Sequence, residues 1–476
     1  MVDGAAVRYG TARGRWVIIA AVLGSGVVFL DGTVVNVALP ALSRDLHASV
    51  RGLQWILDSY LVTLSALLLL GGNAGDRYGR RKMFVAGLAG FVVASVLCGL
   101  APAVGFLIVA RALQGVAGAL LVPASLSIIS SVFDGDDRGR AIGAWSGLAA
   151  VAGAAGPLLG GWLIDAGSWR LIFFLNVPLA AAAVAIALRY VPDTRDDEAG
   201  PLDVTGAALV SAGIALLAYG LIERSVPAGL AGIAALAGFL AVERRRDHPM
   251  LPLSLFASPQ FTGANLTTVA VYGAMSAALF LITLRLQVTL GYSALEAGAS
   301  FLPFTGLMVT LSARIGGVAQ RIGPRLPMTV GPLLSAAGLL LFSRIGPGDR
   351  YVTAVLPAVA LFGLGMTVTV SPLTAAVLGA VDRRRAGVAS AVNNVAARLA
   401  GLLGIAVIPA VAGIDTGGGL ARSLDSGYPA ALRIAVAICS VGAAIAWRFV
   451  RSSALVRPVT HPHPLQACHD ASVEAA

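Results

Sequence analysis

Three ionisable residues of this sequence, Asp31, Asp58 and Arg111, lie inside apolar runs that are long enough to cross a bilayer as α-helices. An ionised group inside a membrane costs on the order of a few kcal/mol unless it is paired, protonated or facing a wet cavity. Ionisable side chains inside membrane-spanning helices predict proton transfer.

The three residues are predicted to lie at a similar depth. Counted from the centre of each run at about 1.5 Å per residue, they fall roughly 6–8 Å to the same side of the midplane. Burial and a nearby cation act on the Asp31 carboxyl in opposite directions, and such a balanced site can take up a proton on one side and release it on the other. Two alternatives are that Asp31 lies at the membrane interface and that Asp58 faces the lipid headgroups.

Arg111 is followed by Gln114 and Gly118 at helical spacing, which gives one polar and small face. We expect this face to point into a helix bundle rather than toward lipid. The alternative role for Arg111 is to bind neighbouring backbone carbonyl groups and nothing more.

A second stretch of small residues runs from 153 to 161. Small side chains allow close helix packing, and a proline bends a membrane helix by removing one backbone hydrogen bond. The stretch predicts a hinge or seam between two bundles, with a static packing contact as the alternative. Its key residues are Gly153, Gly156, Pro157, Gly160 and Gly161.

Residues 71–82 form a short charged segment between two apolar runs, and we expect it to be a compact turn. One acid followed by four cations cannot lie in hydrocarbon, so the segment is predicted to lie at a membrane surface. Its cations favour the cytoplasmic surface. Its motif residues are Gly72, Asp76, Arg77, Gly79, Arg80 and Arg81.

The composition supports a polytopic membrane protein. The 476-residue chain is 57% hydrophobic and 12% charged, which is far from the average of soluble domains. Its net charge of +10 would suit nucleic acid, but the cations are spread over short loops, so we expect no nucleic-acid partner. The three cysteines are far apart in the sequence, so their spacing suggests neither a disulfide framework nor a zinc site.

Nothing in the sequence indicates an enzyme or a bound cofactor. It contains no G-x-x-x-x-G-K-[ST], no H-E-x-x-H and no G-x-S-x-G placed at a strand–helix turn. We therefore expect no metal and no catalytic residues.

The apolar runs predict an all-α fold with fourteen transmembrane helices, arranged as six, two and six. The predicted segments are an N-terminal six-helix bundle (1–190), a linker region with two additional helices (191–250), a C-terminal six-helix bundle (251–455) and a disordered cytoplasmic tail (456–476). Cations concentrate on alternate loops, which places both termini in the cytoplasm. The predicted helices are 15–39, 53–73, 83–101, 104–130, 141–163, 171–190, 202–222, 227–243, 262–290, 295–317, 326–344, 351–378, 387–411 and 430–450.

Together these motifs resemble the major facilitator superfamily, and in particular its fourteen-helix drug:proton antiporter branch. Residues 31–40 are similar to the first-helix signature of that branch, and 111–118 and 153–161 to its fourth- and fifth-helix motifs. Residues 169–178 resemble the beginning of its sixth helix, and 72–81 the loop between helices 2 and 3. The resemblance implies export of drug-like molecules such as antibiotics across the cell membrane, driven by a proton gradient, by a protein that works as a monomer.

On this resemblance, Asp76 and Arg77 belong to a charge network that locks the cytoplasmic face, and Asp31, Arg111 and Asp58 carry proton coupling. A charged turn can form a different set of pairs in each conformational state, as a gate requires. We expect substrate to bind between the two halves. The residues that we expect to line its site are Phe29, Trp55, Gln114 and Trp145, unless their aromatic rings serve only for packing.

Two alternatives remain open at this stage. One is uptake or facilitated diffusion of a small molecule by the same fold, and the other is a membrane receptor or sensor. Arg285 departs from the apolar residue that we expect at its position, and it either snorkels to the membrane surface or contacts an anionic substrate. The C-terminal half offers no clear interior acid, so we expect coupling residues in the N-terminal half.

Overall fold

A computed structural model of the chain describes residues 8–196, 203–246, 249, 251–381, 386–414 and 420–451, which form α-helices with short 3-10 and π turns and no β-strand. Thirteen helical spans in this part are long and apolar enough to cross a membrane. A fourteenth candidate is α2, which is bent by 51° between Val50–Leu68 and Leu70–Tyr78. The predicted all-α, polytopic fold is confirmed.

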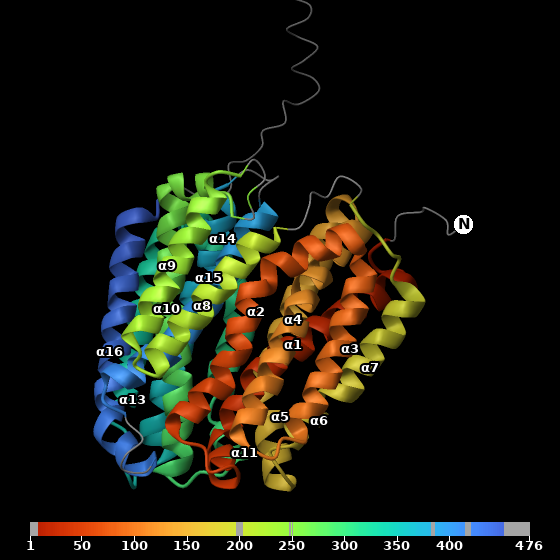
Figure 1. Cartoon of the computed structure of the whole chain (residues 1–476). Helices are drawn as coiled ribbons and strands as arrows, with labels where there is room; N and C mark the ends of the chain where they lie inside the picture. The colour runs from red at the N-terminus through yellow and green to blue at the C-terminus, as the bar shows by residue number, and fades with distance from the viewer. Residues whose placement is uncertain are drawn as a thin grey trace, which may run out of the picture.

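The first group of helices stands on one side of the molecule, coloured red to yellow in Figure 1. Helix α1 packs mainly on α5 and α7, whereas α4 lies between α2 and α3. The group consists of α1 (Ala12–Asp45), α2 (Val50–Tyr78), α3 (Arg80–Gly99), α4 (Val104–Val132), α5 (Gly135–Ala166), α6 (Leu171–Phe174) and α7 (Asn176–Tyr190).

The second group stands beside the first, coloured green to blue in Figure 1. Here α10 packs on α15 and α16, and α13 lies between α14 and α16. The group consists of η1 (Leu253–Ala257), α10 (Pro259–Val288), α11 (Ala294–Ala299), α12 (Leu302–Ile322), α13 (Arg325–Phe342), η2 (Tyr351–Val355), α14 (Leu356–Gly379), α15 (Ala386–Val411) and α16 (Leu420–Phe449).

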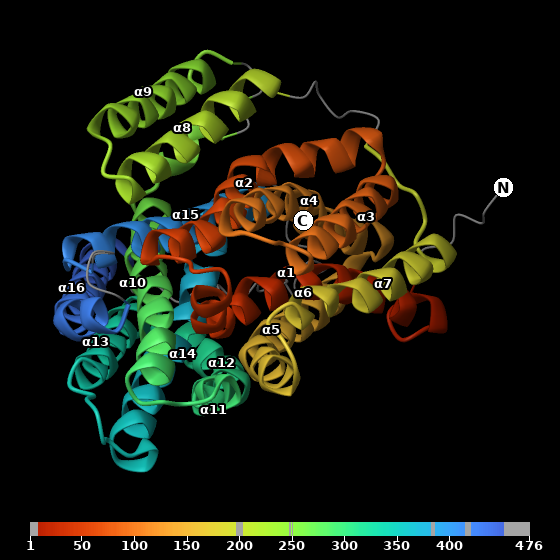
Figure 2. The same cartoon turned by 60° about the horizontal axis from the view of Figure 1, so that its bottom comes forward.

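Two further helices, α8 (Val204–Ile222) and α9 (Val226–Glu243), form a hairpin outside both groups, as Figure 2 shows. Helix α8 contacts α2 of the first group and α15 of the second. Its buried residues Ile214 and Ala218 join a small core with Val62, Ala66 and Leu402. The predicted division at residues 190, 250 and 455 stays a prediction, and its last segment, 456–476, lies outside the described residues.

The prediction that residues 71–82 form a compact turn is wrong in its first half. Helix α2 continues to Tyr78, and the chain reverses only at Gly79, whose φ of 108° suits glycine. A side chain at Gly79 would also meet Asp193, because an added Cβ would lie 2.8 Å from its Oδ1. Hydropathy marks only the apolar part of a helix, so the polar turns at its end escape the pattern.

The predicted start of the last helix is also too late in the sequence, because its first turns are polar. Helix α16 begins at Leu420 rather than at residue 430, and Pro429 lies inside it. The added turns carry Asp425, which therefore belongs to a helix rather than to a loop.

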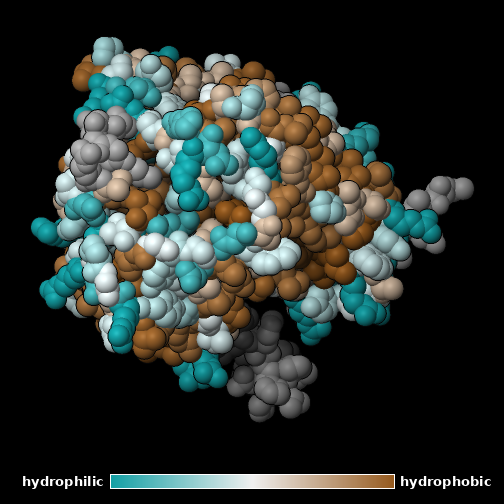
Figure 3. Space-filling view, turned by 90° about the horizontal axis from the view of Figure 1, so that it is seen from below, coloured by the Kyte–Doolittle hydropathy of each residue, from teal (hydrophilic) through white to brown (hydrophobic). Residues whose placement is uncertain are grey.

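Hydrophobic and hydrophilic side chains are distributed as a membrane protein requires. Figure 3 shows the end of the molecule opposite the α2–α3 turn, where hydrophilic side chains spread over the face and hydrophobic ones gather at its margin. Large apolar side chains such as Val109, Val226 and Leu230 are more than half exposed on the helix flanks. Lipid can cover such flanks, since helices satisfy their own backbone hydrogen bonds.

Candidate functional site

Asp31 on α1 and Arg111 on α4 form an ion pair in the interior of the first helix group. Both side chains are buried, with exposed fractions of 0% and 1%. The sequence placed these two residues at one depth, and the structure brings them into contact. A buried pair of this kind requires further hydrogen bonds to offset the loss of hydration.

Two amide side chains supply those hydrogen bonds. Gln114 Nε2 donates to Asp31 Oδ1 at 2.9 Å, and Asn176 Nδ2 donates to the same oxygen at 3.0 Å. Gln114 Oε1 in turn accepts from Arg111 at 2.7 Å. Both amides also donate to Ser95 Oγ, at 2.8 and 3.3 Å. The polar cluster of Asp31, Ser95, Arg111, Gln114 and Asn176 therefore joins helices α1, α3, α4 and α7.

An aromatic ring closes the cluster on the side of α2. The Arg111 guanidinium lies 4.2 Å from the centre of the Tyr60 ring, and its Nε donates to the Ile56 carbonyl at 3.2 Å. The Tyr60 hydroxyl donates to the Val28 carbonyl at 3.1 Å, which fixes the ring against α1. Arg111 thus binds a backbone carbonyl, as one alternative stated, and also pairs with an acid.

Ser95, Asn176 and Tyr60 were not predicted as site residues. Asn176 belongs to the stretch 169–178 that carries the sixth-helix resemblance, and its side chain was the available signal. Ser95 gave no signal, because serine is common on the packed faces of membrane helices. Only the placement of α3 beside α4 shows that its hydroxyl joins the cluster.

Asp58 on α2 does not join this cluster. Its side chain has an exposed fraction of 0%, and neither carboxylate oxygen has a hydrogen-bond partner among the described residues. The alternative that Asp58 faces the lipid headgroups is thus wrong for this conformation. A buried carboxylate without a partner calls for an explanation, because burial of an unpaired charge is strongly unfavourable.

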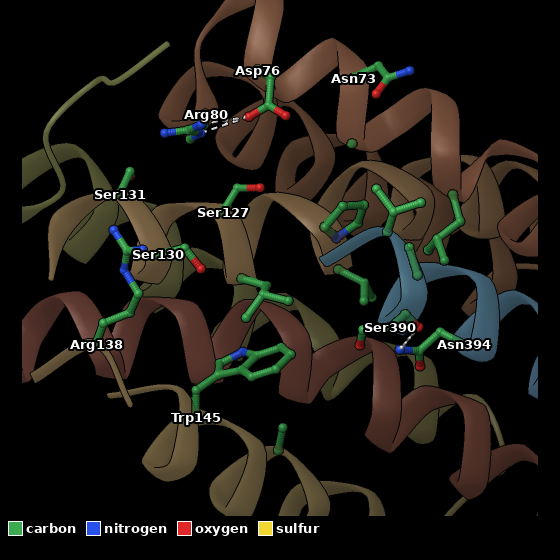
Figure 4. Close-up of a pocket in the computed structure, with 18 of the residues that line it drawn as sticks. Asn73, Asp76, Arg80, Ser127, Ser130, Ser131, Arg138, Trp145, Ser390 and Asn394 are labelled. Atoms are coloured by element: carbon green, nitrogen blue, oxygen red, sulfur yellow. Dashed lines mark hydrogen bonds and ion pairs between the residues drawn. The ribbon is translucent and has the colours of Figure 1, made fainter. Parts of the chain in front are cut away.

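A cavity of about 950 Å³ opens between the two helix groups at the end that carries the α2–α3 turn. Phe29 and Trp145 belong to its apolar wall, and hydroxyl and amide groups make up the rest, with Asn394 and Ser390 on α15 facing the serines of α4 (Figure 4). Its polar lining residues are Asn73, Asp76, Arg80, Ser127, Ser130, Ser131, Arg138, Thr374, Ser390 and Asn394.

Two of the four residues that are predicted to line a substrate site lie at the cavity, and two do not. Phe29 and Trp145 line the cavity, whereas Gln114 is buried in the polar cluster. Trp55 points away from the cavity, since its Nε1 donates to Glu223 Oε1 at 2.8 Å and its ring packs on Tyr219 of α8. Trp145 also has a fixed orientation, because its Nε1 donates to Ser25 Oγ at 2.9 Å.

Among the described contacts of the α2–α3 turn, those of Arg80 and Arg81 lie within the first helix group. Arg80 pairs with Asp76 at 2.9 Å, and Arg81 donates to the Val191 carbonyl at 3.1 Å. The Arg77 guanidinium lies 5.8 Å from the Tyr78 ring. Asp76, Arg80 and Gly72 line the mouth of the cavity, and Gly79 makes the turn.

The small residues of α5 contact two different helices. Gly153, Gly156 and Gly160 face α1, where a Cβ added to Gly156 would lie 2.1 Å from Thr33 Oγ1. Gly161 faces α11 of the second group, where an added Cβ would lie 2.5 Å from the Ala294 carbonyl oxygen. A Cβ at Gly298 of α11 would in turn lie 2.2 Å from the Pro157 carbonyl oxygen. Pro157 and Gly161 thus lie at a seam between the groups, whereas Gly153, Gly156 and Gly160 pack within the first group.

Hydrogen bonds hold the two groups together at this seam. The Asp165 carboxylate accepts from the backbone N–H groups of Ala294 and Leu295, at 3.2 and 2.9 Å. Gln287 donates to the Val37 carbonyl at 3.0 Å, and Gln54 donates to the Ile405 carbonyl at 2.7 Å. The groups are therefore joined at the end opposite the α2–α3 turn and separated by the cavity at the other.

The Arg285 guanidinium binds other groups of the protein and does not snorkel to the membrane surface. It forms an ion pair with Asp425, donates to Thr289 Oγ1 at 3.2 Å and lies 5.1 Å from the Tyr428 ring centre. Asp425 lies near the beginning of α16 and its side chain is 58% exposed, so it does not contradict the expectation that the second half has no clear interior acid.

Comparisons with known proteins agree on one family. The profile of the Major Facilitator Superfamily matches residues 21–405. The chain is 36% identical to the tetracenomycin C resistance and export protein of Streptomyces glaucescens, over 83% of this chain and 76% of that protein. It is 35% identical to the puromycin resistance protein of Streptomyces alboniger, over 95% of this chain and 94% of that protein. A crystal structure of a D-xylose–proton symporter shares the fold, with a TM-score of 0.67 at 15% identity over 92% of this chain and 98% of that one.

Proposed function

This chain belongs to the Major Facilitator Superfamily, and from that premise we propose that it exports amphiphilic small molecules such as antibiotics in exchange for protons. Its similarity to a tetracenomycin C export protein and a puromycin resistance protein supports export of drug-like compounds. The observation that carries the proton coupling is the Asp31–Arg111 pair, which is buried within the helix bundle.

The cavity supports alternating access as the mechanism. It is open at the end of the α2–α3 turn and lies between the two helix groups, whereas Asp165, Gln287 and Gln54 join the groups at the other end. A substrate enters such a cavity from one side and leaves from the other after the groups rock about the site. The cations of the α2–α3 turn support a cytoplasmic opening in this conformation.

The proton step uses the chain's own residues. A proton from the outer side binds one oxygen of Asp31, and the ion pair with Arg111 is lost. Arg111 then remains buried with Tyr60, Ile56 and Gln114 as its neighbours. A lone buried cation is unfavourable, so protonation favours a conformation in which Arg111 finds new contacts. After the protein has returned to the inward-open state, release of the proton to the cytoplasm restores the pair.

Asp58 is a second candidate for proton binding. Its carboxyl group has no described partner, so the neutral acid avoids the burial of an unpaired charge.

The charged turn between α2 and α3 is proposed as the cytoplasmic gate. In the open state Asp76 pairs with Arg80 and the turn is tied to the segment after α7, where Arg80 N donates to the Thr194 carbonyl at 2.8 Å. Closure of the cavity mouth would exchange these contacts for pairs across the two groups. The protein would lie in the cell membrane as a monomer, with both termini in the cytoplasm.

Inverted membrane vesicles from an expressing strain test this proposal. Compounds to which the strain becomes resistant should dissipate an imposed proton gradient in wild-type vesicles, and a protonophore should abolish the resistance. Accumulation of the compounds in whole cells would instead indicate uptake. Neither response with a correctly inserted protein would indicate a receptor or sensor.

A further inference from the structure

Arg398 is a cation beside a lining residue of the cavity, and it has no assigned role. It belongs to α15 of the second helix group, and its guanidinium lies 5.9 Å from the centre of the Phe29 ring on α1. Phe29 lines the cavity, as do Asn394 and Ala391 on the preceding turns of α15. Residues at this spacing share one helix face, so Arg398 lies on the side of α15 that faces the cavity, one turn beyond Asn394.

Arg398 differs from the buried arginines Arg111 and Arg285 in having no counter-ion. Arg111 pairs with Asp31 and Arg285 with Asp425. Among the residues that the structure describes, no carboxylate lies within ion-pair distance of Arg398, and no hydrogen bond from its guanidinium is found. A half-buried guanidinium in such a place lacks the partner that its burial calls for.

The rest of the cavity wall does not supply that partner. Asp76 is the one carboxylate among the described lining residues, and it is already paired with Arg80 at 2.9 Å. Arg138 adds another cation to the wall. Asp31 is closed off behind Arg111 and the two amides, with no exposed surface. A cationic molecule in the cavity would find no free acid, whereas an anionic one would find Arg398.

We propose that Arg398 and the Phe29 ring form a recognition site for an anionic group carried on an aromatic ring, so that the exported molecules are acidic aromatic amphiphiles. The planar guanidinium binds a carboxylate or phenolate oxygen through paired N–H groups, and it also stacks on aromatic faces. Trp145 covers the apolar body of the substrate, and Asn394 and Ser390 bind its oxygen substituents. This inference rests on the proposed function only in taking the cavity as the substrate site.

Binding to the purified full chain in detergent tests the proposal without any proton gradient. Fluorescein and rhodamine 123 share one aromatic scaffold and differ in charge, so the pair isolates the sign of the charge. Fluorescence anisotropy, at an alkaline pH that ionises fluorescein fully, should show tighter binding of fluorescein by the wild-type protein. Arg398→Gln should weaken fluorescein binding by about tenfold or more, because a charge-assisted hydrogen bond is lost. Rhodamine 123 binding should stay the same or improve.

Two further variants make the result specific. Arg398→Lys keeps the charge without the planar fork, so it should retain part of the fluorescein affinity. Arg344→Gln makes the same charge change at an exposed position after α13 and should leave both affinities unchanged.

Three outcomes would overturn the proposal. The first is an equal loss of affinity for both dyes in Arg398→Gln, which would mean that the residue only holds α15 against α1. The second is tighter binding of rhodamine 123 than of fluorescein by the wild type. The third is binding of neither dye. Charge-selective binding without any proton-coupled transport would instead overturn the proposed function and leave this inference standing.

Discussion

The Asp31–Arg111 pair makes a quantitative prediction about charge burial. Asp31→Asn removes one charge with almost no change in shape, and it leaves Arg111 as a cation with an exposed fraction of 1%. We expect this variant to be less stable than the wild type, and unable to bind the transported proton at position 31.

The size of the destabilisation follows from the contacts. Removal of one partner from a buried ion pair costs about 3–5 kcal/mol. The amide oxygen of the introduced asparagine can still accept a hydrogen bond from Arg111, which is worth about 1.5–3 kcal/mol. With the centre of each range, the net loss in the free energy of unfolding is then about 2 kcal/mol. The double variant Asp31→Asn/Arg111→Gln carries neither charge, so its stability should return to within about 1 kcal/mol of the wild type.

Thermal unfolding in detergent, followed by tryptophan fluorescence, measures the four members of this cycle, and gradient-driven transport is measured on the same preparations. We expect stability to recover in the double variant while transport stays lost, because neither protein can carry a proton at position 31. An Asp31→Asn protein as stable as the wild type would refute the charged pair. Recovery of transport in the double variant would refute the role of Asp31 in coupling.

Three other variants test separate parts of the structure. Asp58→Val should raise the free energy of unfolding by about 1 kcal/mol and lower proton-coupled transport, because a buried carboxyl without a described partner is removed; lower stability in thermal unfolding would show that Asp58 has a partner. Ser95→Ala should lower stability by about 1–3 kcal/mol in the same assay, since two buried amides lose an acceptor; an unchanged melting temperature would contradict the cluster. Gly161→Val should separate α5 from α11 and abolish transport without preventing membrane insertion. Gly143→Val, with open space around its Cβ position, should transport normally. Equal transport activity of the two variants would argue against a tight seam.

The sequence was most informative where charge and hydrophobicity conflict. Long apolar runs fix the helices, because the bilayer requires them, and Asp31 and Arg111 stand out as charges within such runs. Depth along a helix can be counted from the sequence, so their shared level was predictable. The rotation of each helix about its axis cannot be counted in this way. Asp58 lies at the same predicted level, yet it turns away from the cluster.

The missed features are polar groups that hydropathy cannot separate from their surroundings. Ser95 and Asn176 are neutral, so nothing in the pattern marks them as hydrogen-bond partners of Gln114 and Asp31. Asp425 was missed because the polar turns that begin α16 were read as a loop. The contact of Arg398 with Phe29 also depends on the arrangement of the two helix groups.

Proton movement in proteoliposomes that contain the purified protein tests the central claim most directly. A compound to which the chain confers resistance is added to vesicles with an imposed pH gradient and an internal pH-sensitive dye. The wild-type protein should let protons flow when the compound is added. Asp31→Asn should bind the compound with unchanged affinity and pass no protons. Equal proton flow through Asp31→Asn and the wild type, or no flow through either, would contradict the account.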